Sequence, residues 1–133
     1  MNISNYASFF HDGSIIGFQH DSSEIVILME SAELSKNDLT DEIILSEYNT
    51  LKGKLHIKNP SIWIDGQPFS GTLRMLADTY FILDFELKNN DLIIFVELIN
   101  YKEKNEKEKY LEIKIHATDI YWENISNLID PFK

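Results

Sequence analysis

Apolar and polar residues alternate with a period of two along most of the chain, the pattern of β-strands with one buried face. Residues 51–58 are the clearest case, with leucine, glycine and isoleucine alternating with three lysines and a histidine. Residues 81–88 alternate similarly, and the turn-forming residues after them predict that 91–101 folds back as the second arm of a hairpin. A third arm is predicted at 110–117. Together these segments predict an antiparallel meander.

The remaining segments carry shorter signals. Residues 14–19 and 24–30 are predicted to pair as a hairpin through the polar turn at 20–23. The alternating-sign charges of 102–109 predict a solvated hairpin tip. Further short strands are predicted at 43–47, 61–65 and 71–76, and short helices at 31–39 and 124–129.

Two predicted strands are apolar on both faces. Residues 25–29 are all apolar, and residues 92–99 are apolar at every position except one. Such strands need cover on both sides, from a curled sheet, a second sheet or another subunit. The prediction is therefore a mainly β fold: a single antiparallel domain over residues 1–133, with about seven to nine strands in a curled sheet, barrel or sandwich and one or two short helices. A homodimer through the surplus apolar face is left open.

The composition indicates one acidic globular domain. The 133 residues include 12 Lys and Arg against 22 Asp and Glu, a net charge of −10, and no cysteine. Cysteine chemistry is thereby excluded, and a nucleic-acid partner is disfavoured because phosphate binding depends on clusters of Lys and Arg. A basic protein partner is favoured instead. Residues 1–10 carry no basic signal region and no apolar run reaches the ~20 residues that cross a bilayer, so a cytoplasmic chain without a membrane partner is expected.

The acidic excess is concentrated between residues 24 and 47. The charged run at 102–109 is balanced and the strand at 51–58 is locally basic, so the excess must lie elsewhere. We therefore expect a basic partner to bind this segment first. Its carboxylates, which face only Lys36, are Glu24, Glu30, Glu33, Asp38, Asp41, Glu42 and Glu47.

Two histidine–aspartate pairs, in 11–14 (HDGS) and 20–23 (HDSS), are candidates for chemistry. Such pairs bind divalent metals or act as a base with its orienting group, which makes His11 and Asp12 candidate site residues. An extended strand between the pairs would separate the histidines by up to ~30 Å, too far for shared ligation. Turns whose side chains bond their own backbone are the favoured interpretation. A metal-dependent hydrolase at His11 and Asp12 is kept as a remote alternative.

Other titratable residues give weaker signals. Glu97 lies among apolar neighbours and is a weak candidate for a general acid, although pairing with a cross-strand lysine such as Lys114 is the favoured interpretation. His56 and His116 are expected to be solvated surface residues. The sequence contains no nucleophile elbow and no glycine-rich phosphate loop, so no catalytic residue, metal ligand or cofactor is predicted.

Two short segments resemble parts of known families. Residues 9–16 (FFHDGSII) resemble the opening of several small β-rich bacterial families, and 55–62 (LHIKNPSI) is similar to their middle section. These families are uncharacterised or of the polymorphic-toxin immunity-protein type, and the similarity covers about a third of the chain. Gly13 stands where serine is frequent in them. The resemblance implies a non-enzymatic protein that binds a protein partner, and a basic toxin would suit an acidic surface.

The sequence thus favours a non-enzymatic bacterial interaction protein, of the immunity type, that neutralises a partner through an acidic or apolar surface. The alternative is a small-molecule-binding β-barrel. In that alternative, Trp63, Tyr80, Phe95 or Trp122 would line an apolar cavity and Glu97 would orient the ligand.

Overall fold

The computed structural model describes residues 3–39, 43–101 and 109–128, and within them the strands form one antiparallel sheet. The nine strands are β1 Ser14–His20, β2 Glu24–Glu33, β3 Thr50–Lys58, β4 Ser61–Ile64, β5 Gln67–Phe69, β6 Thr79–Lys88, β7 Asp91–Ile99, β8 Lys109–His116 and β9 Asp119–Asn124. Their order across the sheet is β5-β4-β8-β7-β6-β1-β2-β3-β9, and the sheet does not close into a barrel. The prediction of a mainly β, antiparallel fold with a curled sheet is confirmed.

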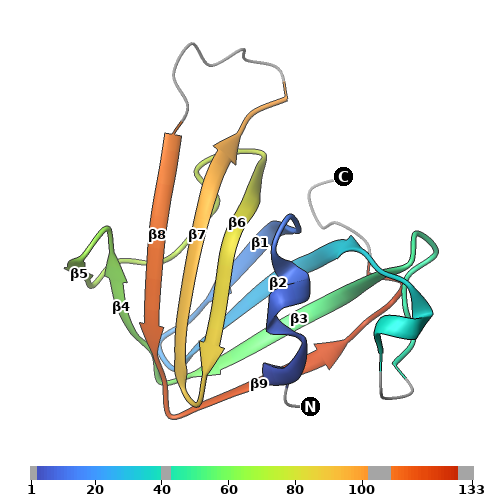
Figure 1. Cartoon of the computed structure of the whole chain (residues 1–133). Helices are drawn as coiled ribbons and strands as arrows, with labels where there is room; N and C mark the ends of the chain where they lie inside the picture. Colours follow the sequence, from blue (N-terminus) through green and yellow to red (C-terminus); the bar gives the residue numbers. More distant parts are fainter. Residues whose placement is uncertain (1–2, 40–42, 102–108, 129–133) are drawn as a thin grey trace.

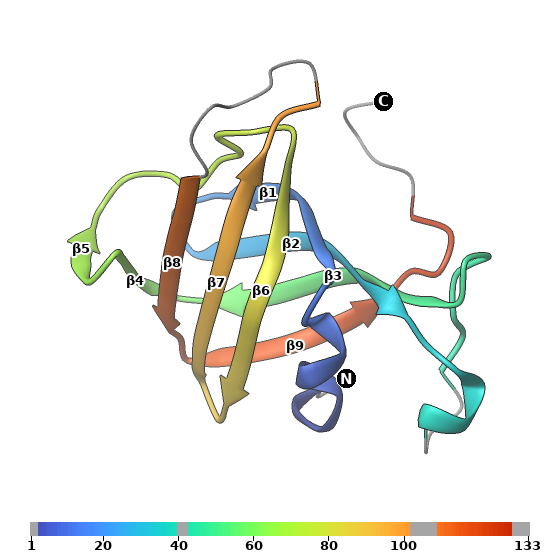
Figure 2. The ribbon, with the colours of Figure 1, turned by 45° about the horizontal axis from the view of Figure 1, so that its top comes forward.

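The sheet folds over on itself, so that two layers face each other. Figures 1 and 2 show β6, β7 and β8 crossing steeply over β1, β2, β3 and β9. Within the sheet the layers meet where β1 pairs with β6 through only two residue pairs, Ser14 with Phe81 and Ile15 with Tyr80. The chain also passes between layers from β3 to β4 and from β8 to β9. This folding covers the inner faces of the strands in both layers.

The core lies between the layers, beside the 3-10 helix η1 (Ser4–Phe10). Phe10 is fully buried, and its ring lies 5.1 Å from that of Phe85 on β6 and 5.4 Å from that of Trp122 on β9. Full burial of a phenylalanine side chain contributes about 1.5–3 kcal/mol to folding. Phe10 therefore fixes η1 to strands of both layers.

The sequence pattern did not predict η1 or β9, and two of its predicted strands are wrong. Residues 43–47 and 71–76 form no strand. Ile43, Leu45, Leu73 and Met75 pack against the core from loops, whereas Ile44 and Leu76 are exposed. A single 3-10 turn, η2 (Lys36–Asp38), lies within the helix predicted at 31–39. The helix predicted at 124–129 is wrong over its described part, which completes β9 and forms a turn. Of the tip predicted at 102–109, residues 102–108 lie outside the described residues and Lys109 begins β8.

Candidate interaction surface

The outer face of β6, β7 and β8 alternates carboxylates with apolar side chains. Phe95 on β7 lies between Asp84 of β6 and Glu112 of β8, and Glu97, two residues further along, lies between two aromatic residues. Directly paired residues of antiparallel strands point to the same side of the sheet. We call this surface the acidic-aromatic face. It comprises Asp91, Ile93, Phe95 and Glu97 of β7, their partners Phe81, Asp84, Glu86 and Lys88 on β6, and their partners Tyr110, Glu112, Lys114 and His116 on β8.

Phe95 and Tyr110 stack on each other at the centre of this face. Their ring centroids lie 5.7 Å apart with an interplanar angle of 13°, and the residues are 38% and 44% exposed. The register places Glu112 opposite Phe95, so the two rings meet along the diagonal between neighbouring strands. Exposed aromatic side chains that cluster on a surface mark sites of protein interaction more often than isolated ones do.

The acidic-aromatic face carries more negative than positive charge. It holds five carboxylates and two lysines, which leaves a formal charge of −3 when His116 is neutral. The Oδ1 atom of Asp91 lies 2.6 Å from Nδ1 of His116. Over the described ranges, none of the other four carboxylates has a lysine or arginine nitrogen within 4.0 Å. Among the described residues, negative charge therefore exceeds positive charge around the aromatic stack.

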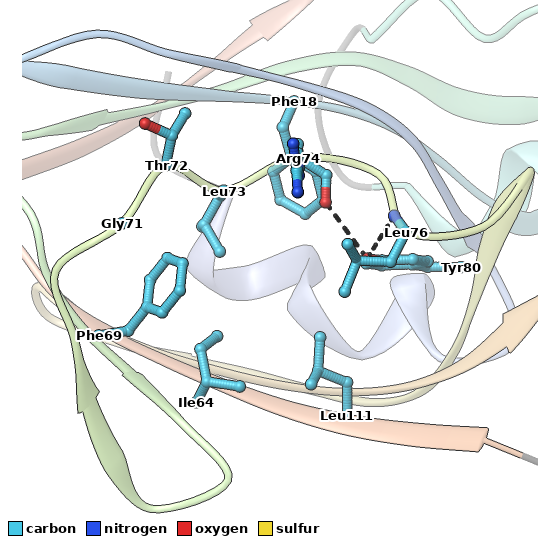
Figure 3. Close-up of a pocket in the computed structure, with 10 residues that line it drawn as sticks. All are labelled: Phe18, Ile64, Phe69, Gly71, Thr72, Leu73, Arg74, Leu76, Tyr80 and Leu111. Carbon is cyan, nitrogen blue, oxygen red and sulfur yellow. Dashed lines mark hydrogen bonds between the residues drawn. The ribbon is translucent and has the colours of Figure 1, made fainter.

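Of the four aromatic residues predicted to line an apolar cavity, Tyr80 lines the cavity between the layers, and Trp63 lines two other pockets. A cavity of about 380 Å³ opens between the layers beside the loop of residues 70–78, and Tyr80 forms part of its wall (Figure 3). Trp122 is 2% exposed and packs in the core, whereas Phe95 and Trp63 lie on the outside of the sheet. Glu97 also points outward, so its predicted role in orienting a ligand inside a barrel is wrong.

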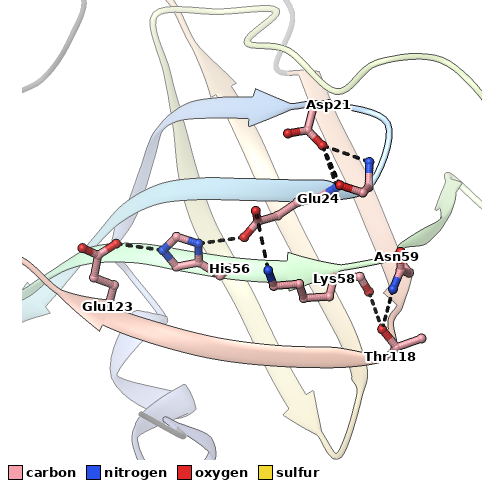
Figure 4. Close-up of polar contacts among 8 residues, drawn as sticks. Asp21, Glu24, His56, Lys58, Asn59, Thr118 and Glu123 are labelled. Carbon is pink, nitrogen blue, oxygen red and sulfur yellow. Dashed lines mark hydrogen bonds and ion pairs between the residues drawn. The ribbon is translucent and has the colours of Figure 1, made fainter.

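A polar network on the outer face of β2, β3 and β9 engages the first residue of the acidic segment. His56 Nδ1 lies 2.9 Å from a carboxylate oxygen of Glu24, and its Nε2 lies 2.8 Å from one of Glu123 (Figure 4). The imidazole ring stacks on Tyr121 with centroids 4.6 Å apart. Along this face four carboxylates alternate with Lys52, Lys54 and Lys58, and the charge is nearly balanced.

Within the described residues, the carboxylates of the acidic segment of residues 24–47 do not all lie on one surface. Glu24 and Glu33 lie at opposite ends of the ten-residue strand β2, roughly 30 Å apart at about 3.3 Å per residue. Glu30 accepts a hydrogen bond from the Thr50 hydroxyl, and a carboxylate oxygen of Asp38 accepts one from a backbone amide nearby. Asp41 and Glu42 lie outside the described residues, and Glu33 and Glu47 are exposed. The acidic-aromatic face is therefore the more continuous acidic surface.

His11 and Asp12 lie in the turn between η1 and β1. His11 Nε2 is 3.7 Å from Asp12 Oδ1, and both side chains are more than half exposed. Asp12 has a positive φ of 67°, and its amide donates a hydrogen bond to the carbonyl of Ile82 on β6. Over the part of the chain that is described, no group of three or more His, Asp or Glu side chains is placed to hold a metal ion. The turn therefore has a structural role: its hydrogen bond to Ile82 fixes the start of β1 to β6.

The second histidine–aspartate pair also has structural contacts. The Asp21 carboxylate accepts hydrogen bonds from the amides of Ser23 and Glu24, both at 2.9 Å, and these bonds lower the pKa of Asp21 below its usual value. His20 Nδ1 accepts a hydrogen bond from the amide of Leu73 at 2.9 Å. His20 thus attaches the loop of residues 70–78 to the end of β1.

The predicted pairing of Glu97 with Lys114 is wrong. The register places Lys114 opposite Ile93, four residues from Glu97 along β7, and Tyr110 opposite Glu97 instead. His116 has a side chain 63% exposed, as expected, whereas that of His56 is only 16% exposed because of the network described above. The strands at 91–99 and 110–116 are visible in the sequence. The register between β7 and β8, which brings Phe95 beside Tyr110, is not.

Over the described ranges, no helix is long and apolar enough to cross a membrane. Comparison of the chain with protein-family models, with curated proteins and with solved structures found no match.

Proposed function

We propose that the chain is a non-enzymatic bacterial interaction protein that binds a basic protein partner through the acidic-aromatic face, as an immunity protein binds a toxin. The observation that carries the proposal is the exposed stack of Phe95 and Tyr110 among carboxylates that have no lysine or arginine partner within the described ranges. Aromatic side chains dominate the energetic centres of protein interfaces. Arginine and lysine side chains bind both aromatic rings and carboxylates.

The two kinds of side chain on the face have different tasks in this proposal. Phe95 and Tyr110 provide the apolar area that a partner removes from water, and so they supply most of the affinity. Asp84, Glu97 and Glu112 surround them and attract a positively charged surface, which raises the association rate and selects against acidic partners. A basic surface with an apolar or arginine-rich centre is the matching partner.

The charge of the face argues against a second copy of the chain as its occupant. In a two-fold symmetric dimer the same patch meets itself, so the formal charge of −3 would face an equal charge. Like charges that are brought together in an interface cost free energy. A homodimer through this face is therefore disfavoured relative to a basic partner.

The experiment is co-expression with the product of the gene adjacent to the one that encodes this chain. If that product is a basic toxin, the wild-type chain should restore growth and should co-purify with it. The variant that combines Phe95→Ala with Tyr110→Ala should lose both effects. The matched control is Tyr48→Ala, because Tyr48 is 70% exposed but lies outside the acidic-aromatic face.

Two outcomes would overturn parts of the proposal. If the adjacent gene product is neither toxic nor bound by the chain, the proposed immunity function is wrong. The product could instead stay bound to the Phe95→Ala, Tyr110→Ala variant and be lost from the Glu33→Gln, Glu47→Gln variant. That result would place the binding surface on the acidic segment of residues 24–47.

A further inference from the structure

The cavity between the layers is lined mainly by apolar side chains from five strands and one loop. Phe18 of β1, Ile64 of β4 and Leu111 of β8 form its walls together with Tyr80 of β6. Figure 3 shows Leu73 pointing into the same space from the loop of residues 70–78. The volume of about 380 Å³ lies within the range of small-molecule sites.

Several of the lining side chains lack apolar cover. Leu76 lies at the rim and is 59% exposed, and Phe18, Ile64 and Leu111 are only partly buried although they point between the layers. Large apolar side chains left partly open to water around one space favour an apolar molecule in that space. The unfilled apolar surface is therefore the first argument for a ligand.

The loop that covers the cavity is held by side chains from both layers. The amide of Leu73 donates to His20 Nδ1 at 2.9 Å, and the amide of Leu76 donates to the Tyr80 hydroxyl at 3.0 Å. That hydroxyl in turn lies 3.3 Å from the carbonyl oxygen of Arg74 and donates to it. The loop is thus fixed in place over a space that it does not fill, as expected for a largely preformed site.

The charge at the rim selects among apolar ligands. Arg74, the only arginine in the chain, is an exposed member of the lining. In the part of the chain that the structure describes, no carboxylate lies within 4.0 Å of its guanidinium group. A guanidinium group binds carboxylates in a bidentate geometry, so the rim favours an anionic end group.

We propose that this cavity binds an aliphatic carboxylate of medium chain length, with the chain between the layers and the carboxylate at Arg74. If each methylene group occupies ~30 Å³, the volume that one water molecule takes up in the liquid, the cavity has room for roughly twelve methylene groups. The carbon chain of a fatty acid with about ten to twelve carbons would fill that volume. The site is separate from the acidic-aromatic face, which lies on the outside of the sheet.

The test is titration of the ¹⁵N-labelled full chain with decanoate, followed by amide chemical shifts and by calorimetry. Decanoate should shift the amides of residues 71–76 and of Tyr80. Decanol has the same chain without the charge and should shift the same amides. Arg74→Gln should weaken decanoate binding about tenfold and leave decanol binding unchanged. Lys114→Gln is the matched control, because it removes an exposed cation from the outside of the sheet.

A substitution that fills the cavity distinguishes binding inside it from binding elsewhere. Ile64→Phe and, as a second variant, Leu111→Phe should abolish the binding of both compounds, with circular dichroism used to confirm that each variant is folded. No shift in residues 71–76 at millimolar decanoate, or equal binding by a folded filled variant, would overturn the proposal. An unchanged affinity for decanoate in Arg74→Gln would overturn the assignment of the carboxylate. Phe95→Ala with Tyr110→Ala should leave decanoate binding unchanged, so this proposal and the proposed function can fail independently.

Discussion

Phe95 and Tyr110 stack on the outside of the sheet, 5.7 Å apart, while the register places a carboxylate directly opposite each of them. Aromatic pairs of this kind contribute about 0.5–1.5 kcal/mol beyond the area that they bury, and in a small β fold such residues usually serve the core. Here they lie outside the core, to which β7 contributes Leu92, Ile94 and Val96, all three fully buried. The pair therefore lies on the surface of the sheet, partly exposed to solvent.

The association rate with a basic partner should depend on the carboxylates beside the stack. The variant that combines Asp84→Asn with Glu112→Gln removes two charges that flank Phe95. Because electrostatic steering acts mainly on the association rate and is screened over about 8 Å at physiological ionic strength, the variant should associate several-fold more slowly at low salt. Its rate should also depend less on salt, as measured by stopped-flow fluorescence. Glu33→Gln with Glu47→Gln is the matched control, and an equal loss of rate in that control would contradict steering by this face.

His56 should contribute more to stability than His116, although each histidine contacts a carboxylate. The side chain of His56 is 16% exposed and bonds Glu24 and Glu123, whereas the side chains of His116 and its partner are both more than 60% exposed. His56→Ala should lower the free energy of unfolding in urea by about 1–2 kcal/mol, because partly buried carboxylates lose their donor. His116→Ala should change it by less than about 0.5 kcal/mol. Equal effects of the two substitutions would contradict the structural role assigned to His56.

The Tyr80 hydroxyl should control how firmly the loop of residues 70–78 is held. Tyr80→Phe removes the acceptor for the Leu76 amide and the donor to the carbonyl of Arg74. The free energy of unfolding should fall by about 1–2 kcal/mol, and hydrogen exchange should accelerate at Leu76. Tyr121→Phe serves as the control, since its ring stacks on His56 and its hydroxyl makes no hydrogen bond within the described ranges. Unchanged exchange at Leu76 in Tyr80→Phe would show that other contacts hold the loop.

Tyr80 should also weaken the fold at alkaline pH. Burial raises the pKa of Tyr80 above its usual 10.0, against the opposing effect of the hydrogen bond from Leu76. The unfolded chain therefore loses this proton at a lower pH than the folded chain does. Stability from the neutral phenol is fully present below about pH 10 and is lost as the pH rises through the pKa of the folded state. The free energy of unfolding should fall more steeply above about pH 10 in the wild-type chain than in Tyr80→Phe, and parallel curves would contradict the raised pKa.

The strand pattern of this fold could be predicted because it depends on local alternation. The strands at 51–58 and 81–88 were visible, and the hairpin of β1 and β2 was predicted with its turn. β9 was not predicted, because its six residues pair with β3 on one side only and alternate over too short a length. The helix η1 has no helical periodicity, and it forms because Phe10 and Tyr6 are buried against strands that are distant in sequence.

The candidate surface could be predicted only in part, because it depends on register between strands. An acidic or apolar surface was expected. The sequence suggested the acidic segment of residues 24–47, but Glu24 and Glu33 of that segment lie at opposite ends of β2. Glu97 was singled out for its apolar neighbours, and it does lie on the acidic-aromatic face. Its partners Phe81 and Tyr110 come from strands on either side, and a shift of one residue in either register would replace them.

The most direct test of the acidic-aromatic face is the dissociation constant of the basic partner identified by co-expression, measured by calorimetry for three chains. The combined substitution Phe95→Ala with Tyr110→Ala should raise the dissociation constant at least about 100-fold, the size expected when interface hot spots are removed. Tyr48→Ala should change it by less than about threefold. Circular dichroism should show that all three chains are folded. A double variant that binds as tightly as the wild type would contradict the assignment of this face as the binding surface.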